Sequence, residues 1–536
     1  MVMRYRILFV ILVCTSGAAA DDYERQPAID VMHYSIALEL SDESDAVTGI
    51  TRIQVRLLGG DVSHMWLDFE GMAVDRLAIA GREIPFTLRD GRLSFDVGRD
   101  RGAGEVISIE ARYHGIPGES GLLISKNRHK QRVMFTENWP DNAHRWFPCI
   151  DHPHDKATVD FSIAAPAKYK VVANGRFSGT KSLPNNRTLT RWSEAVPIPT
   201  YCMVFGAAEF AVTRSGKAAG IPLDLYYYPD DSHSAAVKFA RSKQILEYYA
   251  RLIGPFPYEK LAQVESTTKI GGMENASAIF YAEASFQGKP VRESPVAHEI
   301  AHQWFGDSVT ESDWDHLWLS EGFATYFDAL FCGHADGPVA FKQRMEKAAE
   351  AIRELNEKLP GPVIDPEQKD PVKKLNAYNY EKGAWVLHML RGVVGDQAFF
   401  NGIRSYYRHY QGKSVTTDDF VRVMEAAAGM ALSDFFQQWL TRAGWPHYKI
   451  TWLWNPEAKA VDLEIRQEQT GGLYDMPLEV VLRSERGDQQ QKIRVSRALQ
   501  SYSIPARERP VRLEVDPAGW VLKSVTLQEK APPSSR

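Results

Sequence analysis

The hydrophobic pattern of this chain changes its period twice along the sequence. Over residues 34–210 apolar and polar residues alternate and are interrupted by Gly and Asp, which predicts β-strands joined by turns. Over residues 232–443 apolar residues recur every three to four positions, which predicts helices. The alternation returns over residues 448–525. This order of β, helical and β regions predicts separate domains rather than an internal repeat.

The length supports a multidomain α+β chain. The sequence has 536 residues, of which 44% are hydrophobic, and this is too long for one hydrophobic core. Aromatic and charged residues make up 11% and 24% of the chain, as in folded proteins. We expect a signal peptide at 1–20, an N-terminal β domain at 21–213, a largely helical domain at 214–445, a C-terminal β domain at 446–526 and a disordered tail at 527–536.

The first twenty residues have the features of an export signal. Arg4 and Arg6 precede an apolar run at 7–13, and small residues follow up to Ala20, where we expect cleavage. The run is much shorter than the ~18 residues that a membrane-spanning helix needs, which disfavours an uncleaved anchor. A lipid on Cys14 is disfavoured because the residue before it is bulky. We therefore expect an exported protein, either periplasmic or secreted.

Charge and cysteine content exclude several classes of partner and fold. The formal net charge is −5, which gives no reason to expect binding to nucleic acid or to an anionic membrane. After removal of the signal peptide three cysteines remain, an odd number that is too small for a disulfide framework. We expect buried free thiols, with one disulfide left open as the alternative, among Cys149, Cys202 and Cys332.

The segment His-Glu-Ile-Ala-His at residues 298–302 is the first candidate for chemistry. Residues four apart share one face of a helix, so His298 and His302 can bind one Zn²⁺. Glu299, one position further on, can reach a water molecule beside the metal. Because five residues are a weak signal, a surface helix with two unconnected histidines is the alternative. A second signal must decide between them.

That second signal is an acidic residue in a helix-compatible segment further along. Glu321 follows His302 after eighteen intervening residues, within an aromatic-rich stretch at 318–326. Catalytic zinc sites usually have three protein ligands and leave the fourth position to water, so Glu321 is a candidate third ligand for one Zn²⁺ per chain. Asp328, two turns further, is a candidate hydrogen-bond partner for the far nitrogen of a ligand histidine. An ordinary surface acid is the alternative for Asp328.

Further motifs lie before and after these residues, and together with them they resemble the motifs of a known protein family. They are Phe-Pro-Cys-Ile-Asp at 147–151 with Lys-Ala-Thr at 156–158, Ile-Gly-Gly-Met-Glu-Asn at 270–275 and Tyr-Glu-Lys-Gly-Ala at 380–384. With the zinc motif, the chain resembles the zinc aminopeptidases of the aminopeptidase N and leukotriene hydrolase type, a gluzincin branch. The resemblance covers nearly all of the chain after residue 20. It implies a saddle-shaped N-terminal β domain, a thermolysin-like α+β catalytic domain and a small C-terminal β-sandwich.

The resemblance also implies a role for each residue of the motifs. Glu299 is then the general base, Tyr380 donates its phenol to the oxyanion, and Glu274 holds the α-amino group of the substrate. A strand-end acid and a core tyrosine are the ordinary alternatives for the last two. The implied zinc ligands are His298, His302 and Glu321.

The Gly-Gly-Met segment and its surroundings are expected to bind the rest of the substrate. Gly271, Gly272 and Met273 resemble an edge strand along which a substrate backbone lies, although a Gly-Gly turn is the alternative. Ile270 resembles the floor of the pocket for the first side chain, where an apolar residue favours neutral or apolar N-terminal residues. The chain departs from many relatives at 136–139, where Trp139 stands in place of a second polar residue. Glu137 is then the candidate substitute for holding the amine.

The resemblance implies a zinc-dependent aminopeptidase that removes the N-terminal residue of peptides through a metal-activated water. The expected partners are peptides with a free N-terminus. A leukotriene-type epoxide hydrolase with aminopeptidase activity is one alternative, because both activities share the metal site. A catalytically inactive exported binding protein is the other, although the ligands, the base and the tyrosine are all present. The preferred residue, the natural substrate and the oligomeric state stay open.

Overall fold

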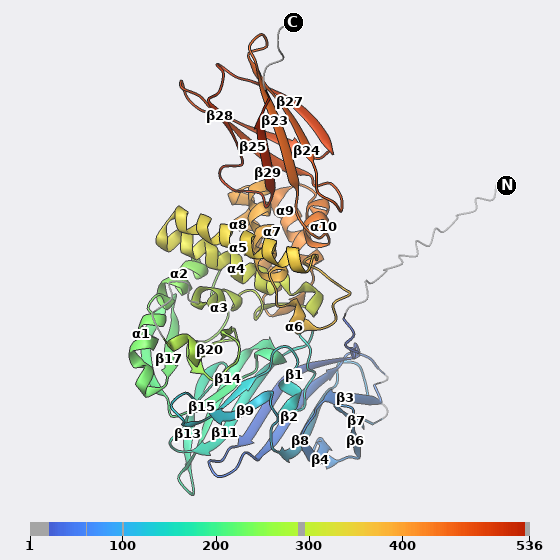
Figure 1. Cartoon of the computed structure of the whole chain (residues 1–536). Helices are drawn as coiled ribbons and strands as arrows, with labels where there is room; N and C mark the ends of the chain where they lie inside the picture. The colour runs from blue at the N-terminus through green and yellow to red at the C-terminus, as the bar shows by residue number, and fades with distance from the viewer. Residues whose placement is uncertain (1–20, 61, 99–100, 288–294, 531–536) are drawn as a thin grey trace, which may run out of the picture.

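The computed structural model describes residues 21–60, 62–98, 101–287 and 295–530. The predicted signal peptide, with its cleavage site and Cys14, lies outside the described residues, as do residues 531–536 of the predicted tail. The described chain forms an N-terminal β-rich part, a mixed α/β part and C-terminal β-sheets. Figure 1 shows the N-terminal and C-terminal β parts at opposite ends of the molecule, with the helices between them.

An eight-stranded sheet forms most of the N-terminal part. Alternating burial along its strands matches the period-two pattern, because successive side chains of a strand point to opposite faces of the sheet. The first strand pairs with the second in antiparallel register and with the eleventh in parallel register. In sheet order the strands are β13 (Arg176–Leu183), β14 (Arg187–Pro199), β11 (Lys156–Pro166), β1 (Ile29–Glu39), β2 (Val47–Leu57), β8 (Val106–Gly115), β4 (Ala73–Ile79) and β5 (Arg82–Glu83).

Two smaller sheets complete the N-terminal part. In the four-stranded sheet the last residue of β10, Glu137, contacts the main chain of Lys269 in the mixed α/β part. Its strands in order are β12 (Lys170–Ala173), β15 (Phe205–Ala208), β10 (Arg132–Glu137) and β9 (Gly121–Lys126). The three-stranded sheet contains β3 (His64–Asp68), β7 (Arg92–Asp96) and β6 (Phe86–Arg89).

A five-stranded sheet begins the mixed α/β part. Its first strand starts at Ala211, so the domain boundary that we predict at 213/214 falls inside this strand. The alternation of apolar and polar residues continues from the N-terminal sheets into this strand, so it does not mark where the five-stranded sheet begins. Its edge strand carries the Gly-Gly-Met segment and pairs with only one neighbour. The order is β16 (Ala211–Ala218), β17 (Ile221–Tyr227), β18 (Leu261–Ser266), β20 (Ala278–Ala282) and β19 (Gly272–Met273).

Helices cover this sheet and make up the rest of the mixed part. The longest apolar one, α4 (Trp318–Asp336), is buried along most of its length and packs against α3 (Val296–His302), α5 (Pro338–Lys358) and α7 (Gly383–Val394). The described helices include none that is both long and apolar enough to cross a membrane. The others are α1 (Ser232–Lys238), α2 (Ser242–Leu252), α6 (Pro371–Lys374), α8 (Asp396–Tyr410), α9 (Thr417–Ala428) and α10 (Ser433–Leu440), with a π-helical turn η6 (Tyr378–Lys382) and a small sheet of β21 (Val309–Glu311) and β22 (Lys413–Val415).

Two C-terminal sheets follow the last helix. The chain leaves α10 at Leu440 and enters β23 at His447, on either side of the boundary predicted at 445/446. The final strand runs to Glu529, so residues 527–529, which we expected in the tail, belong to a strand because they pair in parallel with β23. The sheets contain β27 (Leu499–Pro505), β24 (Ala460–Gln467), β23 (His447–Asn455) and β29 (Ser524–Glu529), and β26 (Gln489–Val495), β25 (Met476–Arg483) and β28 (Arg512–Val515).

The three cysteines of the described chain are free thiols. Cys149 and Cys202 are buried, and Cys332 is half-buried. Burial raises the pKa of Cys332 to about 11 and that of the other two further, so all three stay protonated at neutral pH. The disulfide that the sequence left open does not form among them.

Candidate metal centre and active site

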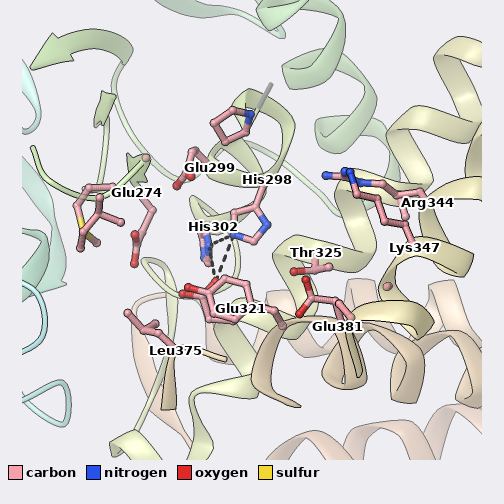
Figure 2. Close-up of a pocket in the computed structure, with 18 of the residues that line it drawn as sticks. Glu274, His298, Glu299, His302, Glu321, Thr325, Arg344, Lys347, Leu375 and Glu381 are labelled. Atoms are coloured by element: carbon pink, nitrogen blue, oxygen red, sulfur yellow. Dashed lines mark hydrogen bonds and ion pairs between the residues drawn. The ribbon is translucent and has the colours of Figure 1, made fainter. Parts of the chain in front are cut away.

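The two histidines of the motif and Glu321 come together at one point. Both histidines lie on α3, one helical turn apart, and α4 packs on α3 and brings Glu321 to the same place. The two Nε2 atoms are 3.0 Å apart, and Oε2 of Glu321 is 3.2 Å from Nε2 of His298 and 3.4 Å from that of His302. Figure 2 shows the three side chains converging.

This triangle of atoms fits a tetrahedral Zn²⁺. Ligand atoms about 2.0–2.1 Å from a tetrahedral ion lie about 3.3 Å from one another, which is the spacing found here. Two imidazole nitrogens and one carboxylate oxygen are also the donor types that zinc prefers at catalytic sites. The residues present therefore fit a zinc ion with three protein ligands.

The surroundings of His302 hold its ring in the form that a metal requires. Its Nδ1 lies 3.1 Å from the carbonyl oxygen of Phe305 and 3.0 Å from the hydroxyl of Ser320. A carbonyl oxygen only accepts hydrogen bonds, so Nδ1 carries a proton and a metal would bind at Nε2. Burial lowers the pKa of His302, but Glu321, Glu274 and Glu299 outweigh it and raise that pKa well above its usual value, so a metal at Nε2 would take the place of a proton. Gly306 is needed beside it, because it has a φ of +119° and a Cβ there would lie 2.4 Å from the Ser320 hydroxyl oxygen.

Burial and mutual attraction determine the charges of Glu321 and His298. Burial alone would raise the pKa of Glu321, but His302 and His298 outweigh it and hold that pKa at about 2. Burial lowers the pKa of His298, although the Glu321 carboxylate opposes the shift. The carboxylate is therefore ionised and ready to balance part of the charge of a divalent cation.

Glu299 lies on α3 next to the first ligand and points into the same cavity. It is buried, and burial raises its pKa to about 8 in the metal-free protein, while a divalent cation nearby would oppose that shift. Its carboxylate fills the space beside Gly272, where a Cβ would lie 2.1 Å from Oε1 of Glu299. In this arrangement the missing side chain at residue 272 makes room for Glu299, whereas Gly271 has open space around it.

Glu274 approaches the metal-ligand group from the edge strand. It is buried, and one of its carboxylate oxygens lies within 4.8 Å of side-chain atoms of both Glu299 and His302. Burial raises its pKa to about 7, and the neighbouring Glu321 adds to this effect. An ammonium group placed beside Glu274 would relieve the cost of burying this carboxylate.

Tyr380 closes the other side of the ligand group. It lies in the π-helical turn η6, a rare conformation that is often found at functional sites. Its ring is parallel to that of His298, with the centroids 5.9 Å apart and an interplanar angle of 9°. Burial and the charge of Glu321, which accepts a hydrogen bond from the phenol, raise its pKa well above 10. The phenol thus keeps its proton and can donate a hydrogen bond.

These side chains line one cavity of about 410 Å³. Of the segment that we expect to bind the substrate, Ile270, Gly272 and Met273 line the cavity and Gly271 is not among the lining residues, while the wall from the N-terminal part is Trp139. Glu137 instead accepts a hydrogen bond from the main-chain N–H of Lys269, at 3.2 Å. The full lining is Trp139, Ile270, Gly272, Met273, Glu274, Pro295, His298, Glu299, His302, Glu321, Thr325, Ala329, Arg344, Met345, Lys347, Ala348, Ala351, Leu375, Tyr380 and Glu381.

Comparison with known proteins agrees with this geometry. The model of the peptidase M1 N-terminal domain matches residues 31–202, and that of the peptidase family M1 domain matches residues 237–439. The chain belongs to peptidase family M1. The second match contains all the candidate metal ligands, the acid after the first histidine and Tyr380.

Several curated relatives of this M1 chain are named aminopeptidases. The glutamyl aminopeptidase of Sus scrofa is 26% identical over 466 residues, which cover 79% of this chain and 48% of that protein. The human glutamyl aminopeptidase is 26% identical over 82% of this chain and 49% of its own length. A probable aminopeptidase 2 of Sulfurisphaera tokodaii is 27% identical over 71% of this chain and 50% of its own length. The chain thus spans about half the length of the curated relatives it matches.

Asp328 makes a different contact from the one that we expected. Its buried carboxylate pairs with Arg344 of α5, with Oδ2 2.8 Å from Nε and a second contact to a terminal guanidinium nitrogen, and its charge also opposes the lowering of the pKa of His298 by burial. The contacts found at Nδ1 of His302 come from Ser320 and Phe305. Helical spacing correctly places Asp328 two turns from Glu321, but the arginine that binds it comes from another helix.

Sequence reasoning missed two features of this M1 site. The first is Gln303, directly after the second ligand, whose amide contacts the main chain of Glu274. The second is the pair Arg344 and Lys347 on α5, which lines the cavity on the side away from Glu274. Gln303 could have been found by its place in the motif, whereas a single sequence contains no signal that brings α5 to the cavity.

Proposed function

We propose that this protein is a zinc-dependent aminopeptidase that hydrolyses the bond after the first residue of peptides with a free N-terminus. One observation carries the proposal. A single cavity is lined by two histidine nitrogens and one carboxylate oxygen at the spacing that zinc requires. The same cavity is lined by the buried acids Glu274 and Glu299 and by the protonated phenol of Tyr380. The metal ligands would be His298, His302 and Glu321.

The residues around the ligands supply the steps of peptide hydrolysis. When bound, zinc would polarise the scissile carbonyl group and make a water molecule more acidic. Glu299 would accept a proton from the attacking water and deliver it to the leaving amine. Tyr380 would donate a hydrogen bond to the oxygen of the tetrahedral intermediate, where negative charge develops. No covalent bond between enzyme and substrate is needed.

Glu274 would make the enzyme an exopeptidase. A carboxylate buried within a few ångströms of the metal ligands gains from pairing with an ammonium group and is left unpaired by a substrate without one. The cavity around it is lined by the apolar side chains of Trp139, Ile270 and Met273. We therefore propose a neutral or apolar first residue for the substrate, although the named relatives are glutamyl aminopeptidases.

The finer features implied by the family resemblance belong to the same proposal. We propose that the N-terminal β part is saddle-shaped, that the mixed part is thermolysin-like and that the C-terminal sheets form a β-sandwich. The charged and apolar pattern of residues 1–20 supports export to the periplasm or the medium. An epoxide hydrolase and an inactive binding protein stay as alternatives, and no contact in the described structure favours either of them.

A panel of aminoacyl chromogenic amides tests the proposal. We expect hydrolysis that a chelator abolishes and that added Zn²⁺ restores. Each amide is paired with its N-acetylated form, which should not be cleaved because it leaves Glu274 without a partner. A longer peptide, analysed for internal cuts, serves as the control for endopeptidase activity. Equal rates on the two members of a pair, or activity that resists the chelator, would contradict the proposal.

A further inference from the structure

The π-helical turn η6, which carries Tyr380, lies directly against the helix of the third candidate metal ligand. Gly322 follows Glu321 on α4, and Gly383 follows the turn at the start of α7. A Cβ on either glycine would lie 2.9 Å from the main chain of the other, so the two backbones touch. This contact fixes one side of the turn beside the metal-ligand group.

The turn ends at Lys382, whose side-chain amino group is fully buried. Nζ donates a hydrogen bond to the main-chain oxygen of Arg442, at 2.8 Å, and lies 5.8 Å from the ring centre of Tyr378 in the same turn. Burial alone lowers the pKa of Lys382 to about 7, and no acidic group of the described residues opposes that shift. Within the described chain, the main-chain oxygen of Arg442 is thus the hydrogen-bond acceptor of this amino group.

Arg442 belongs to the segment that connects α10 with the C-terminal sheets. Its guanidinium donates a hydrogen bond to the main-chain oxygen of Leu473, between β24 and β25, at 2.8 Å. Further along the segment, the indole N–H of Trp445 donates to the hydroxyl of Ser524 at the start of β29, at 2.9 Å. Figure 1 shows α7 and α10 at the end of the helical region that adjoins these sheets. The C-terminal sheets therefore fix the acceptor of Lys382.

The helix that continues the turn packs against the same part of the chain. In α7 the ring of His388 stacks on Trp520, with the centroids 4.7 Å apart, and its Nε2 lies 3.2 Å from the main-chain oxygen of Gly519. One turn further along α7, a Cβ on Gly392 would lie 2.9 Å from the same indole ring. Residues 519 and 520 lie between β28 and β29. The C-terminal sheets thus contact both the end of η6 and the helix after it.

A buried lysine at this position has a cost in folding free energy. Removing its amino group from water is unfavourable, and one main-chain acceptor offsets that cost only in part. A methionine of similar length would fill the space without the cost. Packing therefore does not account for a lysine at residue 382, whereas a fixed link between the turn and the segment at Arg442 does.

We infer that Lys382 is a positioning residue for Tyr380. Its hydrogen bond to Arg442 holds η6 so that the phenol reaches the oxygen of the tetrahedral intermediate. Such a donor must lie about 2.7–3.1 Å from the oxygen on which charge develops, so a small shift of the turn removes its effect. Lys382 is not among the described lining residues of the cavity and acts only through the tyrosine. The inference rests on the proposed aminopeptidase function.

A double-mutant cycle with Lys382→Met and Tyr380→Phe, assayed on an aminoacyl chromogenic amide, tests the inference. Lys382→Met alone should lower kcat about tenfold or more, with KM and zinc content little changed. In the Tyr380→Phe background the same substitution should change kcat by no more than about twofold, because the phenol that it positions is already absent. The melting temperature should fall by no more than about 5 °C, since methionine removes the cost of burying the amino group.

Two further variants address the same link from both of its sides. Lys382→Arg keeps a hydrogen-bond donor and should retain most of the turnover. Arg442→Ala releases the acceptor segment from Leu473 and leaves the lysine in place. It should lower kcat by a smaller factor, and again only when Tyr380 is present. If Lys382→Met does not fold, Arg442→Ala decides by the same criterion.

Lys260→Met is the matched control for these variants. Lys260 is also buried, donates to the main-chain oxygen of Ser277 at 2.9 Å and lies over the ring of Trp192. Any effect of Lys260→Met on kcat should be the same with and without the phenol of Tyr380. Normal kcat in Lys382→Met, or a loss of equal size in both backgrounds, would overturn the inference alone. Failure of the unaltered protein to cleave any aminoacyl amide would contradict the proposed function as well.

Discussion

The side-chain amide of Gln303 donates a hydrogen bond to the main-chain oxygen of Glu274, 2.5 Å away. The same nitrogen contacts Oδ2 of Asp307 at 2.7 Å, and the amide oxygen accepts from the main-chain N–H of Ser277 at 2.7 Å. Gln303 directly follows the second candidate metal ligand and is fully buried. It therefore fixes the distance between the metal-binding helix and the segment that carries the proposed amine-binding acid.

This contact predicts a positioning role for Gln303. In Gln303→Leu the carbonyl of Glu274 and the N–H of Ser277 lose a buried partner, which should cost about 1–3 kcal/mol of folding stability. KM for free-amine substrates should rise more than kcat falls, because Glu274 shifts while the metal ligands stay in place. Kinetics and zinc content of the purified variant measure this. Unchanged KM with reduced stability would leave Gln303 a purely structural role.

The metal ligands and the general base should respond differently to substitution. Alanine at His298, His302 or Glu321 removes a ligand and should lower zinc occupancy as well as activity. Glu299→Gln keeps the shape of the side chain, so zinc should stay bound while kcat falls by several orders of magnitude. Metal analysis beside single-substrate kinetics checks both. Loss of zinc from Glu299→Gln, or substantial activity in it, would overturn the assignment.

Tyr380→Phe should affect turnover and spare binding. The phenol is placed beside Glu321 and stacks on the ring of His298, so its removal deletes one hydrogen-bond donor and little packing. We expect kcat to fall roughly 10²–10³-fold, as for other donors to an oxyanion, with little change in KM. Thermal unfolding of the variant is the control. A lower melting temperature with normal kcat would mean that the tyrosine serves packing only.

Glu274 and Glu137 should differ strongly in their contribution to amine binding. Glu274→Ala removes half of a buried charge pair in the complex and should weaken binding of free-amine substrates by about 2–5 kcal/mol. Glu137→Ala should have a much smaller effect, because Glu137 caps the N–H of Lys269 and Trp139 occupies the cavity wall. Inhibition constants of an amino-acid-like inhibitor measure both. A comparable loss in the two variants would mean that the acids share the amine.

Lys156 should contribute to stability across two parts of the chain. Its ammonium group, at the start of β11, donates to the carbonyls of Asp307 and Ser308 at 2.9 and 2.8 Å and to the hydroxyl of Thr310 at 2.7 Å. Lys156→Met leaves these oxygens without that donor and should cost about 1–3 kcal/mol, measured by urea unfolding. Lys170→Met, which removes one bond to Phe210, is the control and should cost less.

The sequence by itself predicted the secondary structure of each region and the relative positions of residues within one helix. The side-chain periods predicted the β, helical and β regions, because they follow from the geometry of strands and helices. The spacing of His298 and His302 places both imidazoles on one helical face whatever surrounds the helix. The type and order of Glu321, Glu274 and Tyr380 are the basis, through the family resemblance, of the roles that we propose for them.

Only the tertiary structure decided how distant segments meet. The packing of α4 on α3 brings Oε2 of Glu321 within 3.4 Å of Nε2 of His298 and of His302. The packing of α5 on α4 brings Arg344 to Asp328, and the two side chains form an ion pair. The same packing places Lys347 at the cavity. Just after β10, Trp139 lines the cavity, whereas Glu137 accepts a hydrogen bond from the main-chain N–H of Lys269 instead. Such contacts depend on which faces of separate elements become buried together, and the backbone geometry of a single element does not specify that.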